Sequence, residues 1–343
     1  MKFNLIKKLD KKKTKTYFFR IFLLFVIFLL FVIFLIYYFP VKSNNNLFLE
    51  DNFFPEGITI SKNGNIYVGS LKENKIVKFK NKKKDSELFV PSNSNGLMSV
   101  IGILADDHNK ILWACSSNPG VTNYPSDNPV SLKAFDLNSG EPLQSYEFPN
   151  SGFCNDITLD SNNNVYVTDS FNPRILRLNK SQSRLETWFE NDAFKGEGFN
   201  LNGITFTNNN IYTVKMNSGE LFKIGIADNG KPINFTKIDL PRPLNAPDGI
   251  KAINKKNLLV VENKGSLTHI NFNKITTLKI LRDDLDTPTT VAIKGKTAWV
   301  IQAQFGHLFG DEKDVPPGSF EIISVQYKPS ILTSLKKLLN FLN

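Results

Sequence analysis

Cysteine and histidine are scarce in this chain, with two and three copies among 343 residues. Two cysteines, Cys115 and Cys154, are too few for the disulfide framework that holds many small secreted domains together. An outward-facing domain can oxidise such a pair, but we expect two buried thiols. Neither apolar residues, at 41%, nor charged residues, at 22%, are depleted, so the composition excludes a largely disordered chain.

Charged residues are absent from residues 21–39, an apolar and aromatic run of 19 residues that Pro40 ends. At about 1.5 Å per residue, a helix of this length nearly crosses a hydrocarbon core of about 30 Å. We therefore predict a transmembrane helix over residues 21–40. A cleaved signal peptide is the alternative, but the run is longer than the usual apolar region and no small-residue cleavage site follows it. A buried core helix fits poorly, because the run is apolar on every face.

The basic excess of the chain lies mostly before this run. Residues 1–20 carry eight Lys or Arg against Asp10 alone, a net charge of +7, which leaves +3 of the chain's +10 for the remainder. Such a flank indicates membrane orientation and not a nucleic-acid partner. We expect a single-pass protein bound to a lipid bilayer through residues 21–40. Its N-terminus is cytoplasmic, and its large domain is outside the cytoplasm.

Long helical periodicity is missing from residues 48–328, which follow a polar linker at 41–47. Short apolar runs alternate there with turns rich in Asn, Gly and Asp. Six similar stretches each contain a strand, a polar turn and a second strand, and most continue into a third. Aligned on the residue before the first Ile or Val, their spacings are 45, 54, 47, 46 and 41 residues. These anchor residues are Gly57, Gly102, Asp156, Gly203, Gly249 and Thr290.

A period of about 40–50 residues with about four strands per unit is typical of a β-propeller. The predicted fold class is therefore all-β, a six-bladed β-propeller over residues 48–328 behind an N-terminal transmembrane helix. A single blade cannot bury both of its faces, so the ring must close. We expect residues 47–53 to supply the fourth strand of the last blade. An open β-sandwich, the alternative, does not explain six regularly spaced copies.

At one repeat position, four of the six copies carry a carboxylate or carboxamide side chain. The residues just before the anchors are Glu56, Ile101, Asn155, Asn202, Asp248 and Thr289. The first strands of propeller blades line the central channel, so these side chains should meet around the axis. Buried carboxylates need a compensating charge. We predict that Glu56, Asn155, Asn202 and Asp248 bind one metal ion.

The expected cofactor is calcium, a hard cation that carboxylate and carboxamide oxygens suit, with magnesium or manganese as alternatives. No His or Cys occupies the four positions, which argues against zinc and copper. The competing interpretation is turn formation, which Asn and Asp favour before Gly. That interpretation accounts for Asn202 and Asp248. It does not account for Glu56 or for the register that all four residues share.

These residues lie in motifs that resemble the gluconolactonase/regucalcin (senescence marker protein, SMP-30) family. The motifs are PEGI with Glu56, CNDITLD with Asn155, LNGITF with Asn202 and PDGI with Asp248. The likeness spans about residues 50–325 and extends more distantly to paraoxonases and strictosidine synthase-like proteins. It implies an axial calcium that polarises a lactone or ester carbonyl. It also implies that Asp248 is the catalytic residue that activates water, and that Asn155 contacts substrate as well as metal.

Three departures from these families bear on the substrate. Regucalcin-like enzymes hold sugar acids with an Arg where this chain has Phe153, so a sugar-acid lactone is disfavoured and Phe153 becomes a candidate substrate contact. Ile101 and Asn118 are the nearest matches to the two paraoxonase histidines. A histidine-driven mechanism is therefore disfavoured, while Asn118 stays a candidate for substrate binding. No residue matches the catalytic Glu of strictosidine synthase.

Among the histidines, His307 is a candidate substrate-binding residue, because its loop can return to the channel mouth from the last repeat. His108 falls in a polar turn, where we expect exposure, and His269 in a third strand, where we expect a structural role. The long loop at 115–128 is expected to roof the pocket. Residues 329–343 place leucines on one helical face and predict an amphipathic helix.

Two functions fit these features. The first is a membrane-anchored, calcium-dependent hydrolase that acts on a small-molecule lactone or ester. The second is a non-catalytic propeller with a structural calcium that binds a ligand or a protein partner. A propeller fold hosts both kinds of function, so the fold alone does not choose between them.

Overall fold

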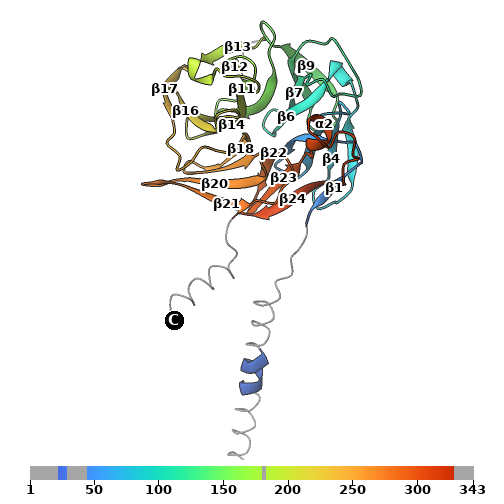
Figure 1. Ribbon diagram of the computed structural model, residues 1–343, viewed down its shortest axis with the longest axis vertical. Helices are drawn as coiled ribbons and strands as arrows, with labels where there is room; N and C mark the ends of the chain where they lie inside the picture. The colour runs from blue at the N-terminus through green and yellow to red at the C-terminus, as the bar shows by residue number, and fades with distance from the viewer. Residues whose placement is uncertain (1–21, 29–44, 180–182, 328–343) are drawn as a thin grey trace, which may run out of the picture. The chain divides into compact units, whose positions relative to one another are not determined.

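The computed structural model describes residues 22–28, 45–179 and 183–327. Residues 45–328 form one compact unit, in which six four-stranded antiparallel sheets are arranged around a common axis (Figure 1). Each sheet is one blade, and the inner strands of neighbouring blades contact one another around the whole ring, including the last with the first. The six-bladed β-propeller predicted from the repeat is confirmed.

The four strands of a blade run outward in chain order, except in the last blade. The inner strands are β2 (Pro55–Ile60), β6 (Ser99–Asp106), β10 (Cys154–Leu159), β14 (Leu201–Thr207), β18 (Pro247–Asn254) and β22 (Pro288–Lys294). The second strands are β3 (Ile66–Ser70), β7 (Ile111–Ser117), β11 (Val165–Asp169), β15 (Asn210–Lys215), β19 (Asn257–Glu262) and β23 (Thr297–Gln302).

The third strands are β4 (Ile76–Phe79), β8 (Ser131–Asp136), β12 (Arg174–Leu178), β16 (Glu220–Ile226), β20 (Ser266–Phe272) and β24 (Phe320–Gln326). The outer strands of the first five blades are β5 (Ser86–Val90), β9 (Pro142–Glu147), β13 (Glu186–Glu190), β17 (Pro232–Lys237) and β21 (Thr276–Arg282). The described helices inside this unit are the 3₁₀ turns η1 (Ser94–Gly96) and η2 (Asp192–Phe194) and the short helix α2 (Gly306–Phe309).

The last blade is completed by the start of the domain. Strand β1 (Leu47–Leu49) pairs antiparallel with β24, with Leu47 opposite Ile322 and Leu49 opposite Phe320. The expected closing strand is confirmed, and it begins at Leu47, a residue that the sequence analysis placed at the end of the linker. Closure of this kind joins the two ends of the ring through main-chain hydrogen bonds and gives the last blade its fourth, outer strand.

Hydrophobic clusters fill the spaces between neighbouring blades. Tyr67 and Ile76 of the first blade pack with Leu112 and Phe135 of the second, and all four are almost fully buried. The same arrangement recurs between the third and fourth blades. Alternation of inward and outward side chains along each strand supplies apolar residues to both faces, as a blade packed on two sides requires.

Every inner strand carries an irregularity at the same repeat position. The pairing register between the first and second strands shifts across the two residues that contain the anchor, for example between Pro55 and Ile58 and between Cys154 and Ile157. The other four inner strands shift at the equivalent place. Such bulges leave residues unpaired and redirect their side chains. The residues unpaired in this way include all four of the predicted metal-binding set.

Glycine at the anchor position permits close approach of neighbouring inner strands. A Cβ atom on Gly57 would lie 2.2 Å from the carbonyl oxygen of Ile101, and one on Gly203 would lie 2.3 Å from that of Asp248. Real Cβ atoms do not come so close to backbone atoms, so only glycine fits there without displacement of the next blade.

Cys115 at the end of β7 and Cys154 at the start of β10 form a disulfide, with Cα atoms 5.1 Å apart. The expectation of two thiols is therefore wrong. The two residues are 39 positions apart in the chain and lie in different blades, and they meet because the second and third blades are neighbours in the ring. The spacing of the two cysteines in the sequence does not by itself predict this contact.

Parts of the predicted N- and C-terminal segments lie outside the described residues. These are residues 1–20, most of the predicted transmembrane helix and the linker, and the amphipathic helix at 329–343. Residues 22–28 are helical. In the part of the chain that is described, no helix combines the length and the apolarity that a membrane crossing requires. The transmembrane anchor stays a prediction.

Candidate functional site

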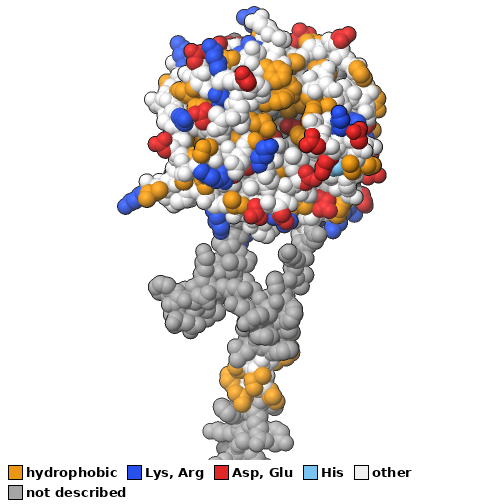
Figure 2. Space-filling model, viewed as in Figure 1, with side chains coloured by type: hydrophobic (Ala, Val, Ile, Leu, Met, Phe, Trp, Pro, Cys, Tyr) orange, Lys and Arg blue, Asp and Glu red, His pale blue; other side chains and the backbone are white. Residues whose placement is uncertain are grey.

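A pocket of about 380 Å³ lies where the inner strands converge. The face seen in Figure 2 is hollowed near the middle of the ring, and hydrophobic side chains gather around the hollow. Two kinds of lining residue make up the pocket. We call the polar group the polar end: Glu56, Asn155, Asn202, Asp248 and Asn263. We call the remainder the apolar wall: Leu71, Ile101, Pro119, Phe153, Phe199, Met216, Phe305 and Phe309.

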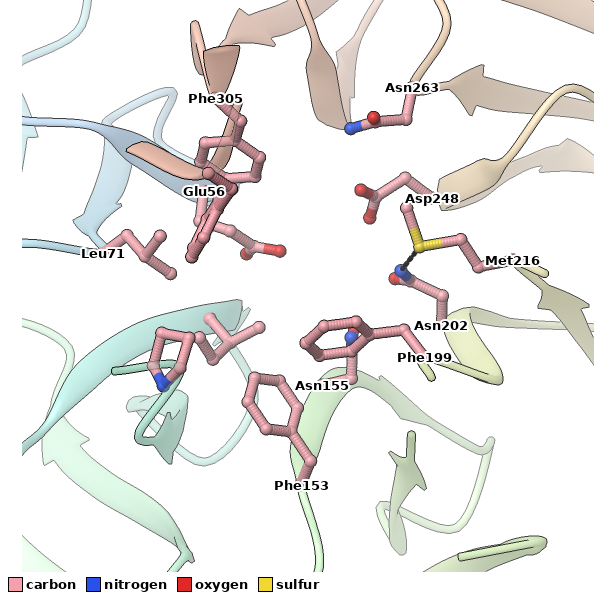
Figure 3. A pocket seen from close by; sticks show the side chains of 13 residues that line it. Glu56, Leu71, Phe153, Asn155, Phe199, Asn202, Met216, Asp248, Asn263 and Phe305 are labelled. Carbon is pink, nitrogen blue, oxygen red and sulfur yellow. Dashed lines mark hydrogen bonds between the residues drawn. The ribbon is translucent and has the colours of Figure 1, made fainter. Parts of the chain in front are cut away.

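All four predicted metal-binding residues lie in the polar end. Figure 3 shows their side chains directed from separate blades toward one space. Ile101 takes the equivalent place in the second blade and belongs to the apolar wall. Thr289 occupies the sixth place but turns away from the pocket, and its hydroxyl donates a hydrogen bond of 2.8 Å to the carbonyl oxygen of Glu56. The repeat register therefore brings together the residues that it was expected to bring together.

Hydrogen bonds orient the two carboxamides of the polar end. The Nδ2 of Asn155 donates to the hydroxyl of Ser170 at 2.9 Å, and the Nδ2 of Asn202 lies 3.5 Å from the sulfur of Met216. These contacts use the amide nitrogens and leave the oxygens for a ligand. The Oδ1 of Asn202 is buried and has no hydrogen-bond partner among the described residues. A buried oxygen without a donor is costly, so it marks a place for a bound group.

The two carboxylates of the polar end are buried close to other negative charges. Burial raises the pKa of Glu56 well above its ordinary value, and repulsion from Asp248 and Asp156 raises it further. The pKa of Asp248 is likewise raised, first by burial and then by Asp156. Without a nearby cation, both side chains therefore favour their neutral forms.

Asp156 and Lys251 form a second layer of charge in the channel. Asp156 stands at an anchor position where four other blades have glycine. Its Oδ1 accepts from the backbone N–H of Ile157 at 2.8 Å, and its Oδ2 accepts from that of Ile204 at 3.1 Å. The ammonium of Lys251 lies 3.5 Å from the same Oδ2. The exception to glycine at Asp156 was the sequence signal for this layer, and the sequence analysis did not use it.

The charges of the channel favour a divalent cation. Glu56, Asp248 and Asp156 carry three negative charges when ionised and Lys251 one positive charge, a net of −2. The available donors are carboxylate and carboxamide oxygens, as calcium and magnesium prefer. No group of three or more His, Cys, Asp or Glu able to hold a metal exists among the described residues. The residues thus fit a hard ion held partly by carboxamides and do not fit a soft one.

The pH dependence of stability tests this charge arrangement. A carboxyl group whose pKa is raised on folding stabilises the fold below its unfolded pKa of about 4 and loses that contribution as pH rises through the folded value. In EDTA, we expect the melting temperature to fall as pH rises from about 4 toward neutrality. Added calcium should reverse this fall, because the ion binds the ionised forms. Melting curves with and without calcium at each pH measure both effects. A melting temperature in EDTA that rises steadily over this pH range would contradict the arrangement.

Asn263 belongs to the polar end, although sequence reasoning did not select it. It follows Glu262, a fully buried residue whose carboxylate accepts two hydrogen bonds from Arg242, at 2.7 and 2.8 Å. Glu262 also accepts a hydrogen bond from the hydroxyl of Thr268. This ion pair lowers the pKa of Glu262 and holds the end of β19, from which Asn263 reaches the pocket. Asn263 directly follows the β19 residue that pairs with Pro247, and Leu71 and Met216 hold the equivalent places after β3 and β15. This second repeat position was the sequence signal for Asn263, and the sequence analysis did not use it.

Phe153, predicted as a substrate contact, lies in the apolar wall. It packs against Phe171 and Phe199, with ring centroids 5.0 and 5.1 Å away. Asp169 fixes the backbone of two of these residues, because its Oδ1 accepts from the N–H groups of Phe153 at 2.9 Å and Phe171 at 3.1 Å. Asp169 is fully buried and is held in turn by Arg174 at 2.9 Å.

Two other predicted substrate-binding residues do not line the pocket. The Oδ1 of Asn118 accepts from the N–H of Gly120 at 2.9 Å, and its neighbour Pro119 is the residue in the wall. The Nδ1 of His307 donates to the carbonyl oxygens of Glu312 and Val315, at 3.1 and 2.8 Å. His307 lies in α2 between two wall residues and ties down the loop after that helix. The loops of both residues reach the pocket through other side chains, Pro119 in one and Phe305 and Phe309 in the other.

The remaining histidines and the long loop behave largely as expected. His108 is exposed, and His269 lies in β20, where its Nε2 is 2.9 Å from the side-chain oxygen of Asn257. The loop predicted to roof the pocket contributes Pro119 to the wall, while its following residues attach to the first blade. The hydroxyl of Thr122 donates to the side-chain oxygen of Asn74 at 2.6 Å.

Comparison with solved structures identifies the same fold in several enzymes. The gluconolactonase XC5397 from Xanthomonas campestris is 12% identical, with a TM-score of 0.59, over 83% of this chain and 91% of that chain. A luciferin-regenerating enzyme is 14% identical, with a TM-score of 0.60, over 83% and 95%. Both are six-bladed propellers of the SMP-30/gluconolactonase-like group. Virginiamycin B lyase from Staphylococcus aureus is 17% identical, with a TM-score of 0.55, over 83% and 99%.

These likenesses confirm the fold resemblance that the four sequence motifs indicated. Protein-family profiles give no match to this chain, and curated protein sequences give none either.

Proposed function

We propose that this protein is a divalent-metal-dependent hydrolase of lactones or related esters, with calcium as the expected ion and magnesium or manganese as alternatives. One observation carries the proposal. Four oxygen-bearing side chains from four blades line one pocket, with a buried amide oxygen that lacks a partner and a net channel charge of −2. Burial of such a set without a cation costs free energy, and a bound hard cation offsets that cost.

Glu56, Asn155, Asn202 and Asp248 would hold the ion. A cation bound there supplies Lewis-acid polarisation of a substrate carbonyl. Asn263 belongs to the same polar end, and its side-chain hydrogen bond to Asp248 would orient that carboxylate. The four residues that would hold the ion are almost fully buried, which strengthens each electrostatic contact that they make inside the pocket.

Asp248 is the proposed general base. Its carboxylate accepts a proton from water as the water oxygen adds to the carbonyl carbon. The bond from that carbon to the alcohol oxygen then breaks, and the proton held by Asp248 passes to the departing alkoxide. In a lactone the alcohol stays attached to the product as a hydroxy acid. Its place in the polar end keeps this carboxylate beside the space where the reacting carbonyl would lie.

The structural neighbours support a hydrolase over a lyase. The gluconolactonase shares this fold. The virginiamycin B lyase also shares it, and a histidine-to-alanine variant of that lyase is catalytically inactive. Among the described residues that line the present pocket there is no histidine. A reaction that depends on a pocket histidine therefore has no candidate here, whereas hydrolysis through a carboxylate base and a cation has one.

We further propose that the protein is held in a lipid bilayer by residues 21–40, with the propeller outside the cytoplasm. The basic flank and the uncharged run support this topology. The disulfide between Cys115 and Cys154 adds support, because such bonds persist mainly in oxidising compartments. Calcium is also more abundant in such compartments than in the cytoplasm.

The direct test is an assay of full-length protein on a panel of lactones and aryl esters. We expect turnover that excess EDTA abolishes and that calcium restores, together with one bound ion per chain in metal analysis. Magnesium and manganese, added separately, identify the preferred cation.

Absence of turnover with every cation would refute the hydrolase. If the purified protein still contained one ion per chain, the remaining interpretation would be the non-catalytic propeller with a structural ion.

A further inference from the structure

The pocket lining separates into two chemical groups. Its five polar lining residues all belong to the polar end, and its eight other lining residues are hydrophobic. Figure 3 shows Leu71, Phe153, Phe199 and Phe305 around the space toward which the oxygen-bearing side chains point. A bound molecule therefore meets oxygen ligands from the polar end and a larger hydrocarbon surface from the apolar wall.

Large apolar side chains also stay exposed beside the pocket. Phe171 is 54% exposed, Phe199 40% and Phe309 55%. Single exposed apolar residues are ordinary, but phenylalanines gathered at a pocket indicate a binding surface. Phe171 and Phe199 contact each other with ring centroids 5.2 Å apart, so the exposed rings continue the wall outward.

The surrounding structure holds this wall in place from both sides. On one side, Asp169 accepts from the backbones of Phe153 and Phe171. On the other side, the N–H of Phe305 donates to the hydroxyl of Thr287 at 2.7 Å, and the N–H of Phe309 donates to the carbonyl oxygen of Phe305 at 2.9 Å. A wall built on such contacts is pre-organised, so a ligand does not have to order it.

The pocket chemistry excludes two classes of substrate. Glu56 and Asp248 are the charged lining residues, and no Lys, Arg or His is among the described residues that line the pocket. An anionic substrate would thus have only the bound cation as a partner. A polyol such as a sugar lactone would place hydroxyl groups against phenyl rings, where their hydrogen bonds to water are lost and not replaced.

From this separation we infer that the substrate is a neutral lactone or ester that carries a hydrocarbon chain or ring. Its carbonyl lies at the polar end and its hydrocarbon part lies along the apolar wall. The inference rests on the proposed hydrolase function and specifies its substrate class. Burial of the hydrocarbon against the wall provides the affinity, since each methylene removed from water contributes about a fourfold gain in binding.

A chain-length series on the full-length protein with calcium tests the inference. The substrates are γ-butyrolactone, γ-hexalactone, γ-octalactone and γ-decalactone, with glucono-δ-lactone as the polyol. We expect kcat/KM to rise by at least about 100-fold from the shortest to the longest, because several methylenes reach the wall. Glucono-δ-lactone should be slower than γ-decalactone. A flat series, or a preference for the polyol, would overturn the inference.

Variants on opposite sides of the apolar wall test whether the wall causes the dependence of kcat/KM on chain length. Phe153→Arg and Phe309→Arg place a charge where the hydrocarbon is expected, and each should reduce the decalactone-to-butyrolactone ratio of kcat/KM by at least about tenfold. Phe309 is half exposed, so its variant should fold even if Phe153→Arg does not. Ile275→Arg is the matched control, because Ile275 is 77% exposed and does not line the pocket. Its ratio should equal that of the unmodified protein in the same detergent.

Binding measurements separate this inference from the proposed reaction. If no lactone is hydrolysed, titration calorimetry with γ-decalactone and with glucono-δ-lactone still reports the preference of the pocket. Tighter binding of γ-decalactone that Phe309→Arg weakens would uphold the substrate class and refute only the catalysis. Equal or tighter binding of glucono-δ-lactone, or no binding of either compound, would refute the substrate class.

Discussion

Asp248→Asn will remove metal-dependent hydrolysis, with an expected loss of at least about 100-fold in kcat. The substitution keeps the shape of the side chain but removes the proposed base and one of the two negative charges that face the ion. Calcium should then no longer raise the melting temperature. Activity with and without calcium, together with melting curves in calcium and in EDTA, measures these effects.

The same substitution should raise the melting temperature of the metal-free protein. Burial and the negative charge of Asp156 raise the pKa of Asp248 in the folded state, so an ionised carboxylate there is costly near neutral pH. An amide relieves that cost. Loss of function with a gain in metal-free stability is a signature that general misfolding does not produce.

Asp85→Asn is the matched control for this substitution. Asp85 lies exposed in the turn before β5, so the same chemical change there should leave both activity and the calcium response as they are. If Asp248→Asn kept full activity and the full calcium response, the assignment of the ion site would be wrong.

Removal of the disulfide will destabilise the propeller by about 4 kcal/mol. The bond closes a loop of 39 residues between the second and third blades, and its loss returns that loop entropy to the unfolded chain. In the double variant Cys115→Ala with Cys154→Ala, we expect the melting temperature to fall by roughly 5–10 °C. Differential scanning calorimetry of both proteins measures the change.

A reducing agent provides the internal control for this prediction. It should lower the melting temperature of the unmodified protein to about that of the double variant and should not affect the variant. Thiol titration of the denatured, unreduced protein should find no free thiol, because the chain has only these two cysteines. Two free thiols per chain would refute the bond.

The sequence predicted the ring because its evidence is periodic. Six copies at similar spacing require six equivalent units, and a four-stranded unit that cannot bury its faces alone requires its neighbours. The same periodicity predicted Glu56, Asn155, Asn202 and Asp248 as one cluster, since equivalent residues of a closed ring lie at the same height. The bulge common to all six inner strands is the local structure that leaves these positions unpaired and turns their side chains toward the axis.

Residues outside the repeat position could not be placed in this way. Phe199 enters the pocket from the loop before β14, and Lys251 of β18 reaches Asp156 of β10 from a different blade. Their contacts depend on how far each loop extends and on which blades face each other. Asn118 was selected as a match to a paraoxonase histidine and His307 for its loop. The residues that line the pocket there are Pro119, next to Asn118, and Phe305 and Phe309, each two positions from His307.

By itself, the sequence determined the number of blades, the closing strand and the identity of the four oxygen-bearing side chains, because each follows from a repeated spacing. The tertiary structure alone decided that Cys115 bonds Cys154, that Lys251 offsets one of three carboxylates, and that phenylalanines from distant loops form one wall. The physical reason is that the symmetry of the ring fixes where equivalent repeat positions lie. Contacts between non-equivalent residues arise only when the ring closes and brings separate loops together.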